Sequence, residues 1–479
     1  MPKRTRTSRL LAIGSLAFAL LQTACAQPEL STERSAPNLI VIMADDLGYA
    51  DVGLNGGTEI PTPHIDQLAA EGVNFTDAYA SYSVCGPSRA GFITGRYQQR
   101  FGFERNPAWK PSDPSVGVPL EETTLAEALR PLGYTSAIIG KWHLGAHENH
   151  HPLNRGFDEF FGHLGGGHRY FPDELYISDY REARNEPESY VTMIMRDHEA
   201  VPTTRYLTDE FTHEALEFIR RQEADAPFFL FLSYNAPHAP LQAPDDVIAQ
   251  FSHVKDKKRR IYSAMVTVLD QGVGQIMELL DELELNEDTL VVFLSDNGGP
   301  TRSNASDNAP LRGTKSMPFE GGFRVPFAAR WPGVIPAGTS FGEPVSSLDI
   351  FATIAALNGI EAAPERPLDG VNLIPYVRGE KSGTPHPQIY LRMFDTNAMA
   401  YREGDFKILS PKRSDVVRLF NVEADISESR NLAATNPERV KAMLEDYQKW
   451  DAQLIEPIFQ GLNMEDWKNP KVRTRSHFD

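Results

Sequence analysis

The sequence predicts an α/β fold in which helices cover both faces of a large, mostly parallel sheet, followed by a smaller antiparallel sheet with one helix. Continuous apolar runs alternate along the chain with amphipathic helical segments, as expected for strands that are covered on both faces. Polar clusters follow several of these runs directly, where open α/β sheets bind their ligands. From about residue 374 the pattern changes to short segments typical of β-hairpins.

The first 26 residues have the features of a secretory signal peptide. Basic residues at positions 3–9 precede an apolar stretch, residues 10–21, that is too short to span a bilayer comfortably. Ala24-Cys25-Ala26 is a cleavage site of the A-x-A type. We therefore expect an exported protein, periplasmic or secreted, without stable membrane insertion after cleavage. Lipidation of Cys25 is the alternative, and the two residues before Cys25 fit a lipobox poorly.

Cleavage lowers the formal net charge from −18 to −22, because it removes four basic and no acidic residues. Such an acidic chain argues against nucleic acid as a partner. A site for an anionic substrate must then be a local basic cleft in an acidic body. Cleavage also leaves Cys85 as the single cysteine, so no internal disulfide forms, and an unpaired thiol in an oxidising compartment requires a reason.

The first half of the chain begins with an apolar run, residues 39–44, which we interpret as a buried strand that ends in Asp45-Asp46-Leu47-Gly48. A helix with two glutamates in its first turn and Gly133 at its end is expected next to a strand that delivers Lys141 and His143. The expected elements are a helix at 63–72, a strand at 73–80, a helix from 88 to 94, a helix at 120–133, a strand at 134–140 and a long loop at 146–204.

The second half of the chain continues the alternation of helices and strands. Its two apolar strands end in the motifs of His238 and of Asp296-Asn297. The expected elements are helices at 208–223, 257–285, 347–358 and 437–454, strands at 227–234, 289–294 and 323–330, and hairpin strands at 388–392, 398–401, 407–410 and 417–421. We expect a catalytic domain over residues 27–373 and a C-terminal α+β subdomain over residues 374–479.

The stretch around Cys85 organises the interpretation of the rest. It reads Cys85-Gly86-Pro87-Ser88-Arg89, followed by Thr94-Gly95-Arg96. Pro87 suits the first helical position, so Cys85 is expected at or just before a helix N-terminus, where an anion is favoured. Arg89 adds a positive charge. A thiol at this place fits either a buried small side chain or a thiolate nucleophile with a lowered pKa.

The motif Cys-x-Pro-Ser-Arg with Thr-Gly-Arg resembles the signature of the type I sulfatases, and the resemblance extends from about residue 37 to residue 431. It is strongest to exported bacterial carbohydrate sulfatases and arylsulfatases. The resemblance implies an alkaline-phosphatase-like fold and hydrolysis of a sulfate ester. It also implies that a formylglycine-generating enzyme converts Cys85 to Cα-formylglycine (3-oxoalanine) during maturation.

Two strand ends carry oxygen donors: Asp45 and Asp46 at one, Asp296 and Asn297 at the other. Carboxylate and amide oxygens suit a hard divalent cation. Asp-Asp-Leu-Gly alone also fits an ordinary turn, but a second cluster of the same kind favours a metal site. The resemblance implies one Ca²⁺ per chain, with Mg²⁺ as the alternative, and adds the residue at position 85 to the ligands.

Cationic side chains at further strand ends complete an expected anion pocket. By resemblance, the catalytic residues are Cys85, Arg89, Lys141, His143, His238 and Lys315. The hydrated formylglycine would attack sulfur, with Asp296 accepting a proton. His238, assisted by Lys315, would protonate the departing alcohol, and His143 would take the proton that allows sulfate to leave. Lys141 would bind sulfate oxygens, since fixed cations stabilise the charge of the transition state.

The substrate is expected to be a sulfated carbohydrate, such as an algal galactan or another polysaccharide. The candidates for sugar contacts are His168 and Arg169 beside the glycines at 165–167, together with Arg100 and Arg302. Alternatives within the superfamily are a phosphate or phosphonate ester hydrolase and an arylsulfatase for small aromatic esters. A non-catalytic anion receptor and a thiol enzyme with unmodified Cys85 are the alternatives from other classes.

Overall fold

The computed structural model describes residues 1–2, 36–174, 193–223, 226–412, 414 and 416–461. From residue 36 onward, the described residues form one compact unit. The expected signal peptide, residues 1–26, lies outside the described residues apart from positions 1–2. Within the described ranges, no helix is long and apolar enough to cross a membrane.

A ten-stranded sheet forms the centre of the described part of the chain, and its five middle strands run parallel to one another. Across the sheet the order is β11 (Thr339–Phe341), β2 (Val73–Phe75), β10 (Phe327–Arg330), β9 (Thr289–Ser295), β1 (Asn38–Ala44), β8 (Phe228–Ser233), β4 (Thr135–Lys141), β5 (Glu159–His163), β6 (Met195–Arg196) and β7 (Glu199–Ala200). Because β10, β6 and β7 pair antiparallel, the sheet is mixed and mostly parallel, as predicted.

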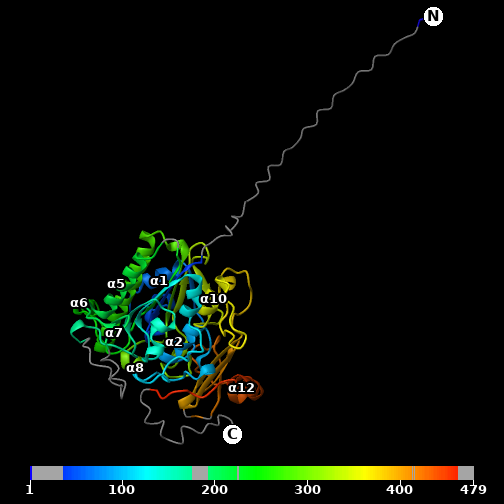
Figure 1. The fold of residues 1–479 in the computed structure, drawn as a ribbon. Coiled ribbons are helices and arrows are strands. Elements are labelled where there is room, and N and C mark those ends of the chain that lie inside the picture. Colours follow the sequence, from blue (N-terminus) through cyan, green and yellow to red (C-terminus); the bar gives the residue numbers. More distant parts are fainter. Residues whose placement is uncertain (3–35, 175–192, 224–225, 413, 415, 462–479) are drawn as a thin grey trace. The chain divides into compact units, whose positions relative to one another are not determined.

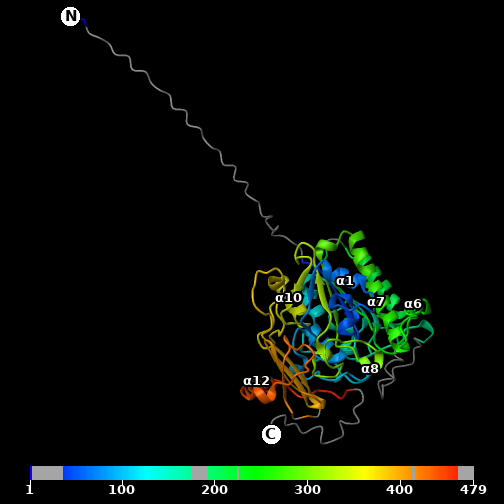
Figure 2. The ribbon, with the colours of Figure 1, turned by 180° about the vertical axis from the view of Figure 1, so that it is seen from behind.

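Strand β1 shows why the apolar runs become central strands. Leu39, Val41 and Met43 pack on one face with the helices α2 (Cys85–Thr94) and α10 (Asp349–Leu357). Ile40 and Ile42 pack on the other face. The helices there are α1 (Pro63–Ala70), α5 (Leu207–Arg220) and α7 (Lys257–Glu282). Each buried apolar side chain of this size contributes about 1.5–3 kcal/mol. Figures 1 and 2 show α5 and α7 on the opposite side of the body from α10.

A second, four-stranded antiparallel sheet lies in the C-terminal part of the chain, as predicted. Its strands are β13 (Gln388–Met393), β14 (Ala398–Glu403), β15 (Phe406–Ser410) and β16 (Arg418–Asn421). On one face Tyr401 and Ile408 pack against Trp450 of helix α12 (Pro437–Asp451). On the other face Leu391 packs with Phe319, which belongs to the segment that carries Lys315. The small sheet therefore lies against a segment of the expected active site.

Some expected elements are divided or shortened in the structure. The strand predicted at 73–80 is two strands, since β2 joins the large sheet and β3 (Ala78–Tyr79) pairs with β12 (Val345–Ser346). The strand predicted at 323–330 begins only at β10, because a short helix, α9 (Glu320–Phe323), precedes it. The helix predicted at 120–133 begins at α3 (Leu125–Leu129), because Thr124 forms a capping box with Glu127.

The segment predicted as a loop at 146–204 contains β5, β6 and β7. These strands extend the sheet beyond β4. Strands β6 and β7 have only two residues each, too few for a pattern of alternation to identify them.

Three further helices were not predicted: α6 (Asp245–Gln250), α8 (Thr301–Asn304) and α11 (Ile374–Val377). Among the described residues, the other expected helices and strands are present with small shifts of their ends.

Candidate active site

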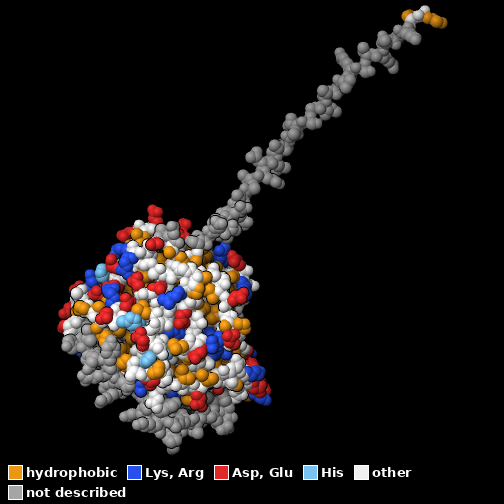
Figure 3. Space-filling model, in the orientation of Figure 1, with side chains coloured by type: hydrophobic (Ala, Val, Ile, Leu, Met, Phe, Trp, Pro, Cys, Tyr) orange, Lys and Arg blue, Asp and Glu red, His pale blue; other side chains and the backbone are white. Residues whose placement is uncertain are grey.

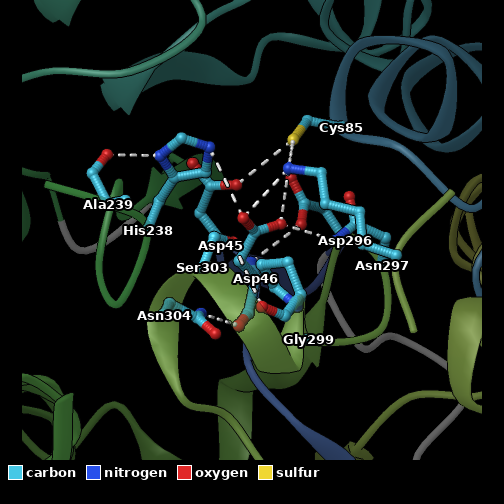
Figure 4. Close-up of polar contacts among 12 residues, drawn as sticks. Asp45, Asp46, Cys85, His238, Ala239, Asp296, Asn297, Gly299, Ser303 and Asn304 are labelled. Carbon is cyan, nitrogen blue, oxygen red and sulfur yellow. Dashed lines mark hydrogen bonds and ion pairs between the residues drawn. The ribbon is translucent and has the colours of Figure 1, made fainter. Parts of the chain in front are cut away.

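The carboxyl ends of β1 and β9 bring together the two oxygen-rich clusters that the sequence predicts. Asn297 Nδ2 donates a hydrogen bond to Asp46 Oδ1 at 2.7 Å, and the Asp46 backbone N–H donates to Asp296 Oδ1 at 3.3 Å. Because β1 and β9 are parallel neighbours, their ends lie at the same edge of the sheet. Asp45 lies beside these residues in Figure 4, and all four are each at most 2% exposed.

Cys85 is the first residue of α2 and lies against Asp45 of this cluster and against Lys315 (Figure 4). Its Sγ lies 3.4 Å from Asp45 Oδ1 and 3.0 Å from Lys315 Nζ. The sequence predicts Pro87 at the first position of the helix, but the helix begins two residues earlier. Cys85 therefore lies in its first turn. The side chain is 1% exposed. The sequence placed this residue correctly at a helix N-terminus, and the structure adds its two partners.

Three cationic side chains neutralise the carboxylates of the cluster. The ion pairs are Lys141–Asp45 at 2.7 Å, Lys315–Asp46 at 2.7 Å and Arg89–Asp296 at 2.8 Å. The side chains of Lys141 and Arg89 are fully buried, and that of Lys315 is 14% exposed. On the face in Figure 3, acidic and basic side chains are interspersed. The three cations and the three carboxylates of the site balance one another in charge, so a basic cleft at this place stays a prediction.

The carboxylates differ in pKa because their surroundings differ. Burial alone would raise the pKa of Asp46, but the charges of Lys315 and His238 lower it to about 2. Burial, followed by the negative charge of Asp45, raises the pKa of Asp296 to about 6 in spite of its ion pair. Crowded carboxylates of this kind favour an additional positive charge.

Burial also determines the state of Cys85. It raises the pKa of the thiol above its ordinary value, and this effect outweighs the lowering by the charges of Lys141 and Lys315. The direction of this shift does not favour the interpretation of Cys85 as a thiolate with a lowered pKa, because burial leaves an anion poorly solvated.

His238 faces the cluster from the segment after β8. Its Nδ1 donates to the Ala239 carbonyl at 2.6 Å, and its Nε2 lies 3.4 Å from Asp46 Oδ2. Burial lowers the pKa of His238 to about 4. The carbonyl thus fixes the ring with Nε2 toward the site, where that nitrogen can exchange a proton with a bound group (Figure 4).

The donor set fits a hard divalent cation. Donor atoms of Asp45, Asp46, Cys85 and His238 all lie within 4.8 Å of one another. Asn297 Oδ1 is buried and, among the described residues, accepts no hydrogen bond. A buried acceptor without a partner costs free energy unless a ligand contacts it. The residues of the site therefore suit Ca²⁺ or Mg²⁺, which bind carboxylate and amide oxygens.

His143 lies close to the cluster and to the glycine-rich turn. It is 2% exposed, its backbone φ is +60°, and within the described ranges neither ring nitrogen has a hydrogen-bond partner. Burial lowers the pKa of His143 well below the ordinary value, and the positive charges of Lys141 and Arg89 lower it further. Both ring nitrogens of this imidazole are therefore available to contact a bound group.

We expect Gly166→Ala to reduce turnover by about tenfold or more, because a small misplacement of a catalytic group has a large effect. A Cβ on Gly166 would lie 2.7 Å from His143 Nε2, so the imidazole ring would have to move. The measurement is kcat on a small aryl sulfate, the surrogate substrate that the resemblance to sulfatases implies. Gly342→Ala is the matched control, since its Cβ would meet only Thr76 Oγ1, at 3.6 Å. Unchanged turnover in Gly166→Ala would show that the position of the ring is not critical.

The candidate sugar-binding residues separate in the structure. Arg169 is exposed, whereas His168 is 1% exposed and its ring centroid lies 5.1 Å from that of His163. Arg302 is exposed on α8, two residues before Asn304, whose Nδ2 donates to the Asp46 carbonyl at 3.0 Å. Arg169 and Arg302 are therefore both exposed, and their contact with a substrate stays a prediction, whereas His168 packs inside the turn.

The prediction that Arg100 contacts the sugar needs a correction. It follows the end of α2 that is opposite to Cys85, about 15 Å away along a ten-residue helix. Its Nη2 pairs with Asp369 Oδ1 at 2.7 Å, and its Nη1 donates to Gln453. The guanidinium therefore serves the contact between the catalytic part and the C-terminal part of the chain. The structure does not bring it to the site.

Two residues at the site have no signal in the sequence. Ser233 Oγ accepts a hydrogen bond from Arg89 Nη1 and donates to the Lys141 carbonyl at 2.7 Å, so it joins two expected catalytic residues. Asn304 holds the backbone of Asp46, as described above. Both contacts depend on which elements are neighbours in the fold. A serine or an asparagine is common at the end of a strand or a helix, so neither residue stands out in the sequence.

Comparison with known proteins identifies relatives along most of the chain. Residues 37–360 match the profile of a family described as Sulfatase. The N-acetylgalactosamine-6-sulfatase of Canis lupus familiaris is 37% identical over 391 residues, which cover 78% of this chain and 71% of that protein. The steryl-sulfatase of Homo sapiens is 34% identical over 426 residues, which cover 74% of this chain and 72% of that protein.

Solved structures agree with these relatives. The crystal structure of Ps i-CgsB in complex with k-i-k-neocarrahexaose superposes with a TM-score of 0.84 and 38% sequence identity, and it covers 92% of this chain and 98% of that chain. The phosphonate monoester hydrolase of Agrobacterium radiobacter superposes with a TM-score of 0.61 at 19% identity, covering 87% of this chain and 95% of that chain. The second likeness shows only the common fold, which is the expected alkaline-phosphatase-like one.

Proposed function

The chain belongs to the sulfatase family and is a sulfuric ester hydrolase, and we propose that it removes sulfate from a sulfated carbohydrate through a formylglycine made from Cys85, with one bound Ca²⁺. The observation that carries the proposal is the arrangement around position 85. An oxygen-rich cluster and its three ion-paired cations lie beside this side chain, which contacts Asp45 and Lys315. Mg²⁺ is the alternative ion.

The carbohydrate substrate is supported by the neighbour with a TM-score of 0.84, since that protein holds a neocarrahexaose. A galactan of the algal type is therefore the proposed substrate class. Export through residues 1–26, to the periplasm or the medium, would bring the enzyme to such a polymer. A formylglycine-generating enzyme is the proposed partner during maturation.

Position 85 is the proposed source of the nucleophile. The Cys85 Sγ in this structure marks the place of an oxygen of the hydrated formylglycine. When formed, that hydrate would supply a hydroxyl nucleophile, and a bound cation would supply Lewis acidity to the site. Asp45, Asp46, Asp296, Asn297 and the residue at 85 would hold the cation.

The surrounding side chains have distinct proposed roles. Lys141 and Lys315 bind sulfate oxygens and stabilise charge as the ester bond breaks. Asp296 accepts the proton of the attacking hydroxyl, and Arg89 holds this carboxylate by its ion pair. His238, with its Nε2 toward the site, and Lys315 protonate the departing alcohol. His143 accepts the proton whose removal allows sulfate to leave.

The alternative is a phosphate or phosphonate ester hydrolase, and a direct assay separates the two. We expect the enzyme to release sulfate from 4-nitrophenyl sulfate much faster than phosphate from 4-nitrophenyl phosphate at equal concentration. The mass of the tryptic peptide with Cys85 tests the modification, since formylglycine is lighter than cysteine. Preferential release of phosphate, or an active enzyme whose Cys85 is unmodified, would contradict the proposal.

Specificity is expected to come from the rim of the site. Arg169→Ala should lower kcat/KM on a sulfated oligosaccharide by about tenfold, because one lost binding group costs about 1–3 kcal/mol in transition-state binding. The same variant should spare 4-nitrophenyl sulfate, which reaches no sugar subsite. Arg100→Ala is the control and should preserve the ratio of the two activities. Equal losses on both substrates in Arg169→Ala would show that Arg169 supports the catalytic core.

A further inference from the structure

The loop of residues 311–323 carries Lys315 into the active site and closes tightly on itself. The Gly321 backbone N–H donates to the Arg312 carbonyl at 2.7 Å, so the two stems of the loop meet. A Cβ on Gly321 would lie 2.7 Å from the carbonyl oxygen of Gly313, which shows how closely the stems pack. Because the loop is compact, a shift of its stems is transmitted to Lys315.

Glu428, which follows β16, contacts both stems of this loop. Its carbonyl oxygen accepts a hydrogen bond from Arg312 Nη1 at 2.8 Å, and its Oε2 accepts one from the Glu320 backbone N–H at 2.8 Å. Glu428 has no exposed surface, and its backbone φ is +48°, which is uncommon for a residue other than glycine. Such a conformation persists only where the surroundings fix it.

Lys407 on β15 joins the two glutamates. Its Nζ lies 2.7 Å from Glu320 Oε1 and 3.0 Å from Glu428 Oε1, and all three side chains are fully buried. The Tyr79 hydroxyl donates to Glu320 Oε2 at 2.7 Å. Loss of one partner would leave a buried charge without compensation, so the ion pairs of Lys407 with the two glutamates resist rearrangement. The small sheet therefore holds the loop by buried, mutually dependent bonds.

We propose that Glu428 is a positioning residue for Lys315, through which the C-terminal sheet sets the geometry of the anion pocket. This inference rests on the proposed function, because it uses the role of Lys315 at the departing alcohol. Lys315 Nζ lies 3.0 Å from Cys85 Sγ and 2.7 Å from Asp46 Oδ1. A small displacement of the loop would lengthen both contacts and weaken the support that Lys315 gives to the reacting ester.

The expected effect is partial and depends on the leaving group. The tip of the loop keeps its own anchor, since the Ser316 backbone N–H donates to the Ser83 carbonyl at 2.8 Å. Loss of Glu428 should therefore loosen Lys315 without releasing it. An ester of 4-nitrophenol needs little help as its oxygen departs. An ester of a weakly acidic alcohol or phenol depends strongly on a proton donor and on nearby positive charge.

The experiment compares kcat for sulfate esters of phenols of decreasing acidity. In Glu428→Gln, which keeps the size and one acceptor oxygen, we expect kcat to fall about tenfold for phenyl sulfate and less than about twofold for 4-nitrophenyl sulfate, with KM nearly unchanged. In Glu428→Ala, kcat should depend more steeply on the acidity of the departing phenol. Rates are taken well below the unfolding temperature and per mole of formylglycine, so that poor folding or poor maturation does not enter.

Glu104→Gln is the matched control. Glu104 is a buried glutamate that binds Arg392 of the C-terminal sheet and the Phe394 backbone N–H, and both of these partners lie outside the 311–323 loop. It should keep the wild-type dependence on the leaving group even if it lowers stability. A uniform loss for all esters in Glu428→Gln, or no loss, would overturn the inference.

Lys315→Ala separates this inference from the proposed function. It should show the steepest dependence on the leaving group of the whole series. If Lys315→Ala lost activity equally for all esters, the proposed role of Lys315 would be wrong. If Lys315→Ala showed the dependence while both Glu428 variants did not, the role of Lys315 would stand and the positioning role of Glu428 would be wrong.

Discussion

Cys85→Ala and Cys85→Ser are each expected to lower multiple turnover by at least about a thousandfold, the scale on which loss of a nucleophile acts. Alanine supplies no nucleophile. Serine supplies a single hydroxyl beside Asp45 and Lys315, so it lacks the second hydroxyl of a hydrated aldehyde. We therefore expect Cys85→Ser to retain a sulfate group from the substrate, visible as a heavier peptide. The measurements are steady-state sulfate release and peptide mass after incubation with substrate.

Val84→Ala is the control for Cys85, because Val84 is the neighbour in sequence, half-buried and without a reactive group. It should keep both formylglycine and turnover. Thermal unfolding of each variant shows whether the fold is retained. Normal turnover by Cys85→Ser would contradict the mechanism, since a single hydroxyl would then be sufficient.

Asp45→Ala is expected to lose the bound cation and to lower activity by roughly a hundredfold or more, since even the outer shell of a metal site acts on a scale of 10–100-fold. Asp45 is also the partner of the fully buried Lys141, at 2.7 Å. Removing one member of a buried ion pair costs about 3–5 kcal/mol, so the variant should unfold at a lower temperature. Asp45→Asn keeps the shape and gives a milder test of the charge.

The metal content of the purified protein is the direct measurement, and we expect one Ca²⁺ per chain. Removal by a chelator should abolish activity, and separate addition of Ca²⁺ and Mg²⁺ identifies the preferred ion. Asp288→Ala is the control. Asp288 is exposed and lies just before the start of β9, whereas Asp296 lies just after its end. Wild-type activity in a protein free of metal would refute the assignment of these residues.

The main features of fold and site could be predicted because they are encoded locally. The burial of β1 on both faces appears as a run of apolar residues, and the ends of parallel strands appear as the polar residues that follow. Helix α3 was predicted too long because acidic residues before its capping box resembled a first turn. The stretch after β4 was predicted as a loop, because short strands lack a periodic signal of their own.

Distant pairs could not be predicted in the same way. Arg100 flanks the motif of Cys85 in the sequence, yet its partner Asp369 is 269 positions away and lies beyond the far end of α2. His168 stands in a glycine-rich turn that suggests exposure, whereas its ring packs inside. A local pattern of residues shows neither the direction of such a side chain nor its partner.

The sequence by itself determined the fold class, the strand ends with oxygen donors, and the chemistry around Cys85, because periodicity and motif are properties of neighbouring residues. Only the tertiary structure decided which groups touch. Asn297 bonds Asp46 across 251 positions, and Glu428 of the C-terminal part holds the loop of Lys315. The physical reason is that these contacts depend on the order of strands in the sheet and on buried charges meeting their partners, which chain folding sets and local composition does not.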